Sequence, residues 1–257
     1  MKSKKINNNL DKLIDIVKKL RAPDGCAWDK EQTHESLIPY LIEETYEVIE
    51  AIEQKNFKSL KEELGDLLLH VIFQIDLSQE NKQFNVNDVI DGVSDKLIRR
   101  HPHIFYPKND PRYQEDNWEL SKKKEKKRES VLEGVPVGLP ALIRAQRIQE
   151  KASAVGFDWK YKDQVLLKID EEVKELKEAI IDKKGIEEEV GDVLFTVVNL
   201  SRHLGYDAES ALKQSIKKFS DRFKRIEKDL KKKNIEMQNL SLEELDIIWN
   251  KNKLKEN

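Results

Sequence analysis

The sequence is poor in cysteine and in the residues that interrupt regular structure. It has 9 glycines, 7 prolines and a single cysteine among 257 residues, and so little glycine argues against a turn-rich β fold. Cys26 has no second cysteine with which to form a disulfide, as expected of a reducing compartment. The longest apolar run, from Leu67 to Ile75, is too short to span a bilayer, and no signal peptide is evident. We therefore expect a cytoplasmic protein that does not contact membranes.

The sequence also lacks an excess of charge of one sign. It has 47 Lys and Arg residues against 49 Asp and Glu residues, for a formal net charge of −2, so no overall field attracts nucleic acid. The basic run from Lys122 to Arg128 is interpreted as a solvated helix end rather than an RNA contact. Glycine-rich phosphate loops are absent, which argues against P-loop chemistry.

Apolar residues recur at helical spacing along most of the chain, and this pattern predicts an all-α fold. Helices are expected from about Ser36 and from about Phe57. Pro102 is expected to end a helix that the second half of the chain continues. The segment 133–140 contains two glycines and two prolines and is the predicted linker. It separates two predicted helical modules, residues 1–132 and 141–257.

Two acidic motifs occur once in each predicted module. The first motif, E-E-x-x-E, spans Glu43, Glu44 and Glu47 and recurs at Glu171, Glu172 and Glu175. The second motif, E-x-G-D, runs from Glu63 to Asp66 and recurs from Glu189 to Asp192. Because the order of the motifs is kept, the sequence predicts a duplicated helical module.

The spacing within each motif predicts a metal site. Residues three apart lie on one side of a helix, so antiparallel packing of two such helices brings four carboxylates together. The glycine in the second motif is costly within a helix, and its recurrence indicates a close approach of the two backbones. Sites made only of oxygen ligands suit Mg²⁺ or Mn²⁺.

Together with the repeated acids, four further segments resemble those of a known family. They are Gly25-Cys-Ala-Trp-Asp-Lys-Glu-Gln-Thr-His34, Arg99-Arg-His-Pro-His-Ile-Phe105, Val155-Gly-Phe-Asp-Trp159 and Lys218-Phe-Ser-Asp-Arg-Phe223. Over residues 10–250 the chain resembles the two-domain bacterial MazG family of all-α nucleoside triphosphate pyrophosphohydrolases. The resemblance implies helical bundles that are completed by homodimerisation. It also implies Mg²⁺-dependent attack of water at the α-phosphorus of a nucleoside triphosphate, which releases pyrophosphate and a nucleoside monophosphate.

The resemblance also implies roles for individual residues. Expected metal ligands are Glu172, Glu175, Glu189 and Asp192 in the second module, with Glu44, Glu47, Glu63 and Asp66 as their counterparts in the first. The expected catalytic residues are Glu171, Glu172 and Glu175, and Glu171 is the candidate for handling the attacking water. The expected substrate contacts are Lys168, Glu171, Glu188, Lys218, Arg222 and Trp249.

Both modules have the complete acidic set, but the second has Lys168 where the first has Tyr40. The resemblance implies that the second module is the principal catalyst and the first is structural or regulatory, and we take this difference as a sign of the same division. Two alternatives remain open from the sequence: a helical scaffold that binds nucleotide or a partner protein without useful turnover, and a narrower dUTP or pyrimidine hydrolase. The preferred base cannot be inferred from any local motif.

Overall fold

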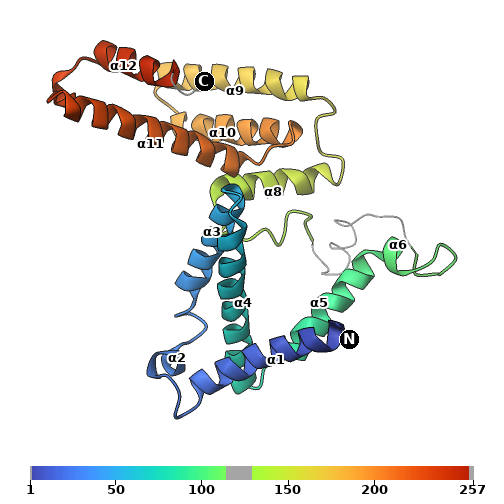
Figure 1. Cartoon of the computed structure of the whole chain (residues 1–257). Helices are drawn as coiled ribbons and strands as arrows, with labels where there is room; N and C mark the ends of the chain where they lie inside the picture. The colour runs from blue at the N-terminus through green and yellow to red at the C-terminus, as the bar shows by residue number, and fades with distance from the viewer. Residues whose placement is uncertain (1, 114–128, 255–257) are drawn as a thin grey trace. The chain divides into compact units, whose positions relative to one another are not determined.

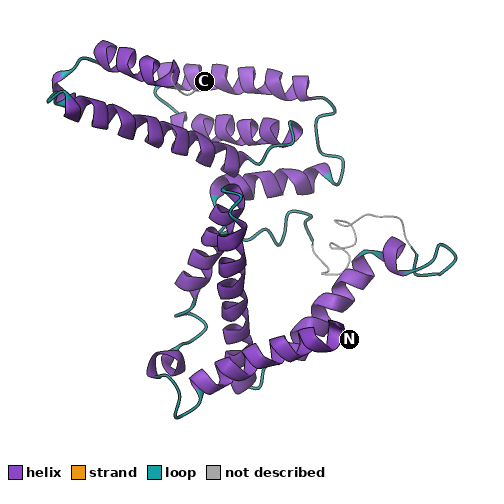
Figure 2. Cartoon of the chain, in the orientation of Figure 1, coloured by secondary structure: helices purple, strands orange, loops and turns teal. Residues whose placement is uncertain are grey.

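A computed structural model describes residues 2–113 and 129–254, and within these ranges the regular structure is helical, without strands (Figure 2). The all-α prediction is therefore confirmed. The basic run Lys122–Arg128 lies outside the described residues. Across both described ranges, no helix is long and apolar enough to cross a membrane.

The chain divides into two compact units, Met1–Asp116 and Asn117–Asn257. The helices of the first unit are α1 (Lys2–Arg21), α2 (Ala27–Glu31), α3 (Ile38–Glu53), α4 (Phe57–Glu80), α5 (Val86–Arg100) and α6 (Pro102–Phe105) (Figure 1). Those of the second unit are α8 (Ala141–Ser153), α9 (Lys162–Asp182), α10 (Ile186–His203), α11 (Ala208–Lys232) and α12 (Leu242–Leu254), with a 3-10 turn at Met237–Asn239. The predicted linker 133–140 is not helical, and the predicted module bounds remain a proposal.

In the first unit, α3 and α4 form an antiparallel pair and lie side by side (Figure 1). Asn56 caps α4 by accepting a hydrogen bond from the backbone N–H of Ser59 at 3.2 Å, which stabilises the start of the helix. The core packs α1 against the C-terminal half of α4 and contains Val17, Leu37, Ile72, Phe73, Ile75 and Leu77. This core fixes α4 and therefore the acidic motif on its first half.

In the second unit, α9 and α10 form the corresponding pair and pack against each other extensively. Lys183 and Gly185 adopt left-handed backbone conformations in the turn between them, with φ of 54° and 72°. Helix α8 joins the pair because Gln149 donates a hydrogen bond to the carbonyl of Phe195 at 2.8 Å. The side chain of Gln146, also on α8, accepts a hydrogen bond from the backbone N–H of Ala208, at the start of α11, at 3.1 Å.

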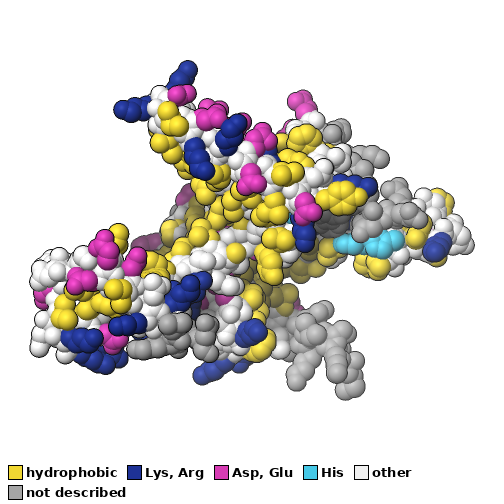
Figure 3. Space-filling view, turned by 90° about the horizontal axis from the view of Figure 1, so that it is seen from above, with side chains coloured by type: hydrophobic (Ala, Val, Ile, Leu, Met, Phe, Trp, Pro, Cys, Tyr) yellow, Lys and Arg dark blue, Asp and Glu magenta, His cyan; other side chains and the backbone are white. Residues whose placement is uncertain are grey.

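The helix predicted to end at Pro102 does so, since α5 ends at Arg100 and α6 begins at Pro102. Its counterpart α11 continues to Lys232, so this prediction is confirmed. Many large apolar side chains remain exposed on the helices, and hydrophobic side chains lie among charged ones on the face shown in Figure 3. On α11 the exposed residues Leu212, Ile216 and Phe219 form a stripe.

Candidate metal centres

The first acidic cluster forms between α3 and α4. Carboxylate oxygens of Glu44, Glu47 and Glu63 lie within 4.8 Å of one another. Asp66 lies one turn further along α4 than Glu63. Among the charged neighbours of Glu44, it raises the pKa of that residue most. The predicted convergence of the carboxylates is therefore present in this unit, where oxygens of three of the four acids lie within 4.8 Å of one another. The predicted close approach of the two backbones at the glycine of the second motif is wrong, because a Cβ atom at Gly65 or Gly191 would meet nothing within 4 Å.

The first cluster is not neutralised by its own side chains. Burial first, and then the charge of Asp66, raises the pKa of Glu44 above its usual value. Burial and the charge of Glu47 likewise raise the pKa of Glu63. The Oε2 atom of Glu44 is buried and has no hydrogen-bond partner within the described part of the chain. A buried carboxylate oxygen without a partner is costly, and a cation relieves that cost.

The second acidic cluster forms in the same way between α9 and α10. Ligand oxygens of Glu172, Glu189 and Asp192 lie within 4.8 Å of one another. Glu175 is not part of this group of three. Its charge nevertheless contributes, after burial, to raising the pKa of Glu189. Glu172 is only 5% exposed, so this cluster also contains a buried carboxylate.

Lys168 distinguishes the second cluster from the first. It lies on α9 one turn before the acids, and its Nζ atom is 2.7 Å from Glu172 and 2.8 Å from Glu171. Hydrogen bonds to Glu171 and then Glu172 raise the pKa of Lys168 above its usual value, so the amine stays charged. The buried carboxylate of Glu172 thus has a cationic partner, whereas Oε2 of Glu44 has no partner in the described part of the chain.

The remaining predicted substrate contacts lie on other elements of the second unit. The guanidinium carbon of Arg222, on α11, lies 4.7 Å from the ring centroid of Trp249, on α12. Phe219 packs against the same Trp249 ring at 5.0 Å. Arg222 is buried, while Lys218 and Glu188 are exposed. The structure therefore forms a cation–aromatic pair on the α11–α12 hairpin, and the carboxylates lie on a different helix pair.

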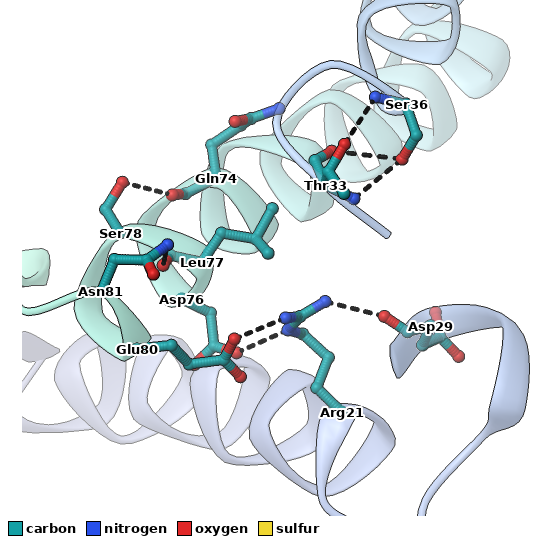
Figure 4. A network of polar contacts seen from close by, with 10 residues as sticks. All are labelled: Arg21, Asp29, Thr33, Ser36, Gln74, Asp76, Leu77, Ser78, Glu80 and Asn81. Atoms are coloured by element: carbon teal, nitrogen blue, oxygen red, sulfur yellow. Dashed lines mark hydrogen bonds and ion pairs between the residues drawn. The ribbon is translucent and has the colours of Figure 1, made fainter. Parts of the chain in front are cut away.

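Each unit also anchors the loop that precedes its acidic helix pair. In the first unit, Arg21 at the end of α1 bonds Asp76 at 3.0 Å, Glu80 at 2.7 Å and the carbonyl of Asp29 at 2.7 Å (Figure 4). Both Arg21 and Asp76 are buried. This network holds the loop after α1 against α4, and nothing in the local sequence pattern identified Arg21 as its centre.

In the second unit the anchor is Asp158, within the Val155–Trp159 motif. It accepts hydrogen bonds from Arg202 at 2.5 Å and from His203 at 3.0 Å, both near the end of α10. Burial raises the pKa of Asp158, but the hydrogen bonds that it accepts, among them those from Arg202 and His203, lower this pKa by more, to about 2. The motif thus serves to attach a loop to α10.

A family model described as the MazG nucleotide pyrophosphohydrolase domain matches residues 32–105 and 161–226. The chain belongs to the MazG family. It is 50% identical over 245 residues to a nucleoside triphosphate pyrophosphohydrolase/pyrophosphatase MazG of Thermotoga maritima, with 95% of each chain covered. It is 43% identical over 259 residues to a nucleoside triphosphate pyrophosphohydrolase of Escherichia coli, with 97% of this chain and 98% of the relative covered.

The two matched segments confirm the predicted duplication, because each MazG segment encloses one acidic cluster. The second segment also includes Lys168 and Arg222 but ends before Trp249. The first begins after Trp28. These two tryptophans therefore lie outside the matched MazG segments.

The residues of both clusters fit a divalent cation of the hard, oxygen-binding type. All candidate ligands are carboxylates, drawn from two packed helices. The partnerless buried oxygen of Glu44 marks a place where a positive charge is needed in the first cluster. In the second, Lys168 already meets part of that need. The two MazG segments thus carry the same ligand type in different electrostatic settings.

Proposed function

We propose that the chain hydrolyses nucleoside triphosphates to nucleoside monophosphate and pyrophosphate at the α9–α10 cluster, with Mg²⁺ as the cofactor and Mn²⁺ as a substitute. The observation that carries this proposal is the contact of Lys168 with Glu171 and Glu172 beside the three-carboxylate group. It places a cation able to bind phosphate next to carboxylates able to bind a metal. Family membership and the names of the relatives support the same reaction.

In this proposal Glu172, Glu175, Glu189 and Asp192 hold the ion. When bound, the ion neutralises phosphate charge and makes hydroxide more available at neutral pH. Glu171 is the general base, since it is more than half exposed at its side chain and lies beside the buried ligand Glu172. It accepts the proton of the attacking water. Water adds to the α-phosphorus, and the bond from that phosphorus to the bridging oxygen breaks as pyrophosphate leaves.

The phosphates are met by Lys168, which exchanges its contacts with Glu171 and Glu172 for contacts with the substrate. We propose that Lys218 and Arg222 bind the rest of the triphosphate and that Trp249 stacks on the base or closes the pocket. Glu188, exposed in the first turn of α10, is proposed to contact the sugar or base. The pair formed by Arg222 and Trp249 supports this assignment, because it holds a guanidinium and an aromatic ring together.

We further propose that two copies of the chain assemble into a homodimer that completes these helical bundles. The support is the exposed apolar surface of the catalytic helices, including Leu167 and Ile181 on α9 and Leu194 on α10, each more than half exposed. Sedimentation tests this directly. A species of twice 30.1 kDa is expected, whereas a monomer at catalytic concentrations contradicts dimerisation.

The proposed reaction is tested by incubating the purified chain with individual triphosphates, including dUTP, in the presence of Mg²⁺ and separating the products by chromatography. Nucleoside monophosphate and pyrophosphate are expected, and chelation of the metal should abolish their formation. Nucleoside diphosphate and orthophosphate would contradict attack at the α-phosphorus. Tight binding without any product would favour a nucleotide-binding scaffold, and turnover confined to dUTP or other pyrimidines would favour the narrower hydrolase. Broad turnover supports a role in controlling cytoplasmic nucleotide pools.

A further inference from the structure

Lys168 contacts two acids of the second cluster at the same time. Its Nζ atom lies 2.8 Å from Oε1 of Glu171 and 2.7 Å from Oε1 of Glu172. All three residues belong to α9, where the acids follow the lysine by three and four positions, so the amine reaches both carboxylates on one side of the helix. Glu171 is the proposed general base and Glu172 is a proposed metal ligand. One side chain therefore pairs with both groups that the proposed reaction needs.

The two contacts of Lys168 differ in how far water screens them. The side chain of Glu171 is 56% exposed, so its pair with Lys168 is weakened by solvent. The side chain of Glu172 is only 7% exposed, and a buried carboxylate that loses its cationic partner needs another one. The pair with Glu172 is therefore the contact that opposes a rearrangement of the site.

Glu172 also belongs to the group of three acids that fits a divalent cation. Carboxylate oxygens of Glu172, Glu189 and Asp192 lie within 4.8 Å of one another. A metal ion that enters this group competes with the Lys168 amine for Glu172, and the two positive charges repel each other at such short range. Metal binding to the α9–α10 cluster is therefore weakened for as long as the amine stays paired with Glu171 and Glu172.

A lysine is suited to leave such a pair when a phosphate is near. Its ammonium group is a point charge with three donors on a flexible four-carbon stem. The side chain of Lys168 is 30% exposed, so a solute can reach it from solvent. A triphosphate offers several charged oxygens to these donors. The amine can therefore exchange the carboxylates for phosphates by rotating its own side chain, while the backbone of α9 stays in place.

We propose that Lys168 couples metal binding to substrate binding in the second unit. The amine holds Glu171 and Glu172 until the phosphates of a nucleoside triphosphate draw it away, and the acids then hold the divalent cation firmly together with the substrate. The same exchange frees Glu171 to accept the proton of water, so the base becomes available when a substrate is present. This inference rests on the proposed function and adds the order in which the parts of the site assemble.

The first unit has a tyrosine at the position that corresponds to Lys168. Tyr40 lies one turn before Glu44, and its ring stacks on that of His70 with centroids 6.2 Å apart. A tyrosine carries no positive charge that could compete with a metal ion, and Oε2 of Glu44 is buried without a hydrogen-bond partner in the described residues. Lys168 therefore gives the second unit a coupling between phosphate and metal that Tyr40 cannot supply.

The coupling is measured in a background whose first cluster is disabled, Glu44→Gln with Glu47→Gln, so that Mn²⁺ reports on the second cluster. Electron paramagnetic resonance of free Mn²⁺ gives its Kd without and with saturating α,β-methylene-ATP, which resists hydrolysis at the α-phosphorus. The ratio of these two constants is the coupling factor. Lys168→Met is expected to lower the coupling factor about tenfold, because Mn²⁺ binds more tightly without the analogue once the competing amine is gone. The affinity of Mn²⁺ for the analogue in solution is the same for every variant and cancels in this comparison.

Two matched variants separate this role from a general effect of charge on α9. Lys168→Arg keeps a cation within reach of both acids and should keep the coupling factor within about threefold of the parent value. Lys174→Met removes a lysine from an exposed pair with Glu178 on the same helix, 3.6 Å apart, and should change neither constant. If Lys168→Met weakens binding of the analogue but leaves the Kd of Mn²⁺ alone unchanged, Lys168 is only a phosphate contact and the proposal is overturned. Equal changes in Lys174→Met would overturn it as well.

Failure of the coupling is distinguishable from failure of the proposed hydrolysis. Turnover to monophosphate and pyrophosphate with an unchanged coupling factor in Lys168→Met overturns the coupling and leaves the hydrolysis intact. A coupling factor that falls as expected, in a chain that forms neither product, supports the coupling and contradicts the hydrolysis.

Discussion

In the first unit a buried carboxylate oxygen of Glu44 has no partner among the described residues, whereas its counterpart Glu172 pairs with Lys168 at 2.7 Å. The acids correspond one for one between the two MazG segments, yet the side chain one turn before them is Tyr40 in one and Lys168 in the other. A duplicated ligand set can therefore serve two purposes. The first cluster leaves a buried carboxylate oxygen without a partner among the described residues, and the second pairs its acids with Lys168.

The largest effect expected from this difference is on turnover. Replacing both Glu172 and Glu175 by Ala should reduce hydrolysis by about 1000-fold, since the ligands of a metal that stabilises transition-state charge are worth several kcal/mol. Replacing Glu44 and Glu47 by Ala should leave most of the turnover. Steady-state rates of the two double variants check this prediction. A loss confined to the Glu44 and Glu47 variant would assign catalysis to the first unit.

The loop anchors differ between the units as well, and this difference predicts unequal losses of stability. Arg21→Met leaves the buried carboxylate of Asp76 without its partner, so the first unit should lose about 3 kcal/mol of unfolding free energy. Arg202→Met, at the more exposed anchor of the second unit, should cost about 1 kcal/mol. Urea unfolding of the two variants compares these costs. Equal losses would show that burial does not distinguish the anchors.

The different side chains one turn before the acids, Lys168 and Tyr40, are tested by replacing each of them. Lys168→Met removes the competitor for Glu172 and should tighten Mn²⁺ binding to the second cluster about tenfold in the absence of nucleotide. Tyr40→Lys supplies that competitor to the first cluster and should weaken its Mn²⁺ binding by a similar factor. Calorimetric titrations are made in backgrounds where the other cluster is disabled. Shifts in the same direction for both variants would contradict the account.

A further difference concerns the acid stability of the second unit. The pKa of Asp158 is lowered to about 2 in the folded chain, below an unfolded value of about 3.9. Its contribution is therefore complete above about pH 4 and is lost as the pH falls toward 2, amounting to roughly 2–3 kcal/mol. Asp158→Asn should flatten this part of the stability profile in urea titrations. An unchanged slope would show that Arg202 and His203 do not stabilise the ionised form.

Helical spacing and the repeated motifs were sufficient to predict the all-α fold, the duplication and the approach of the acids on each helix pair. They did not predict which oxygens converge. Glu47 joins the first group and Glu175 does not join the second, although the two residues correspond in the motif. Side-chain rotamers and the packing of each helix pair decide this, and neither is encoded in residue spacing.

The ring contacts among Trp28, Tyr40 and His70 and the Arg21 network could not be predicted for a different reason. Trp28, Tyr40 and His70 are far apart in the sequence and meet only because the loop after α1 packs against α3 and α4. Arg21 lies at the end of α1 like many basic residues, and its bonds to Asp76 and Glu80 cross more than fifty residues. One local signal was available: the Gly25–His34 motif carried the family resemblance and had no assigned role.

The central claim is that water attacks the α-phosphorus at the α9–α10 cluster. It is tested most directly by following ATP hydrolysis with Mg²⁺ in ¹⁸O-labelled water, using the Glu44→Ala and Glu47→Ala double variant, and analysing both products by mass spectrometry. The account predicts steady turnover with one labelled oxygen in the nucleoside monophosphate and none in the pyrophosphate. Label in pyrophosphate, or loss of turnover in this variant, would contradict it.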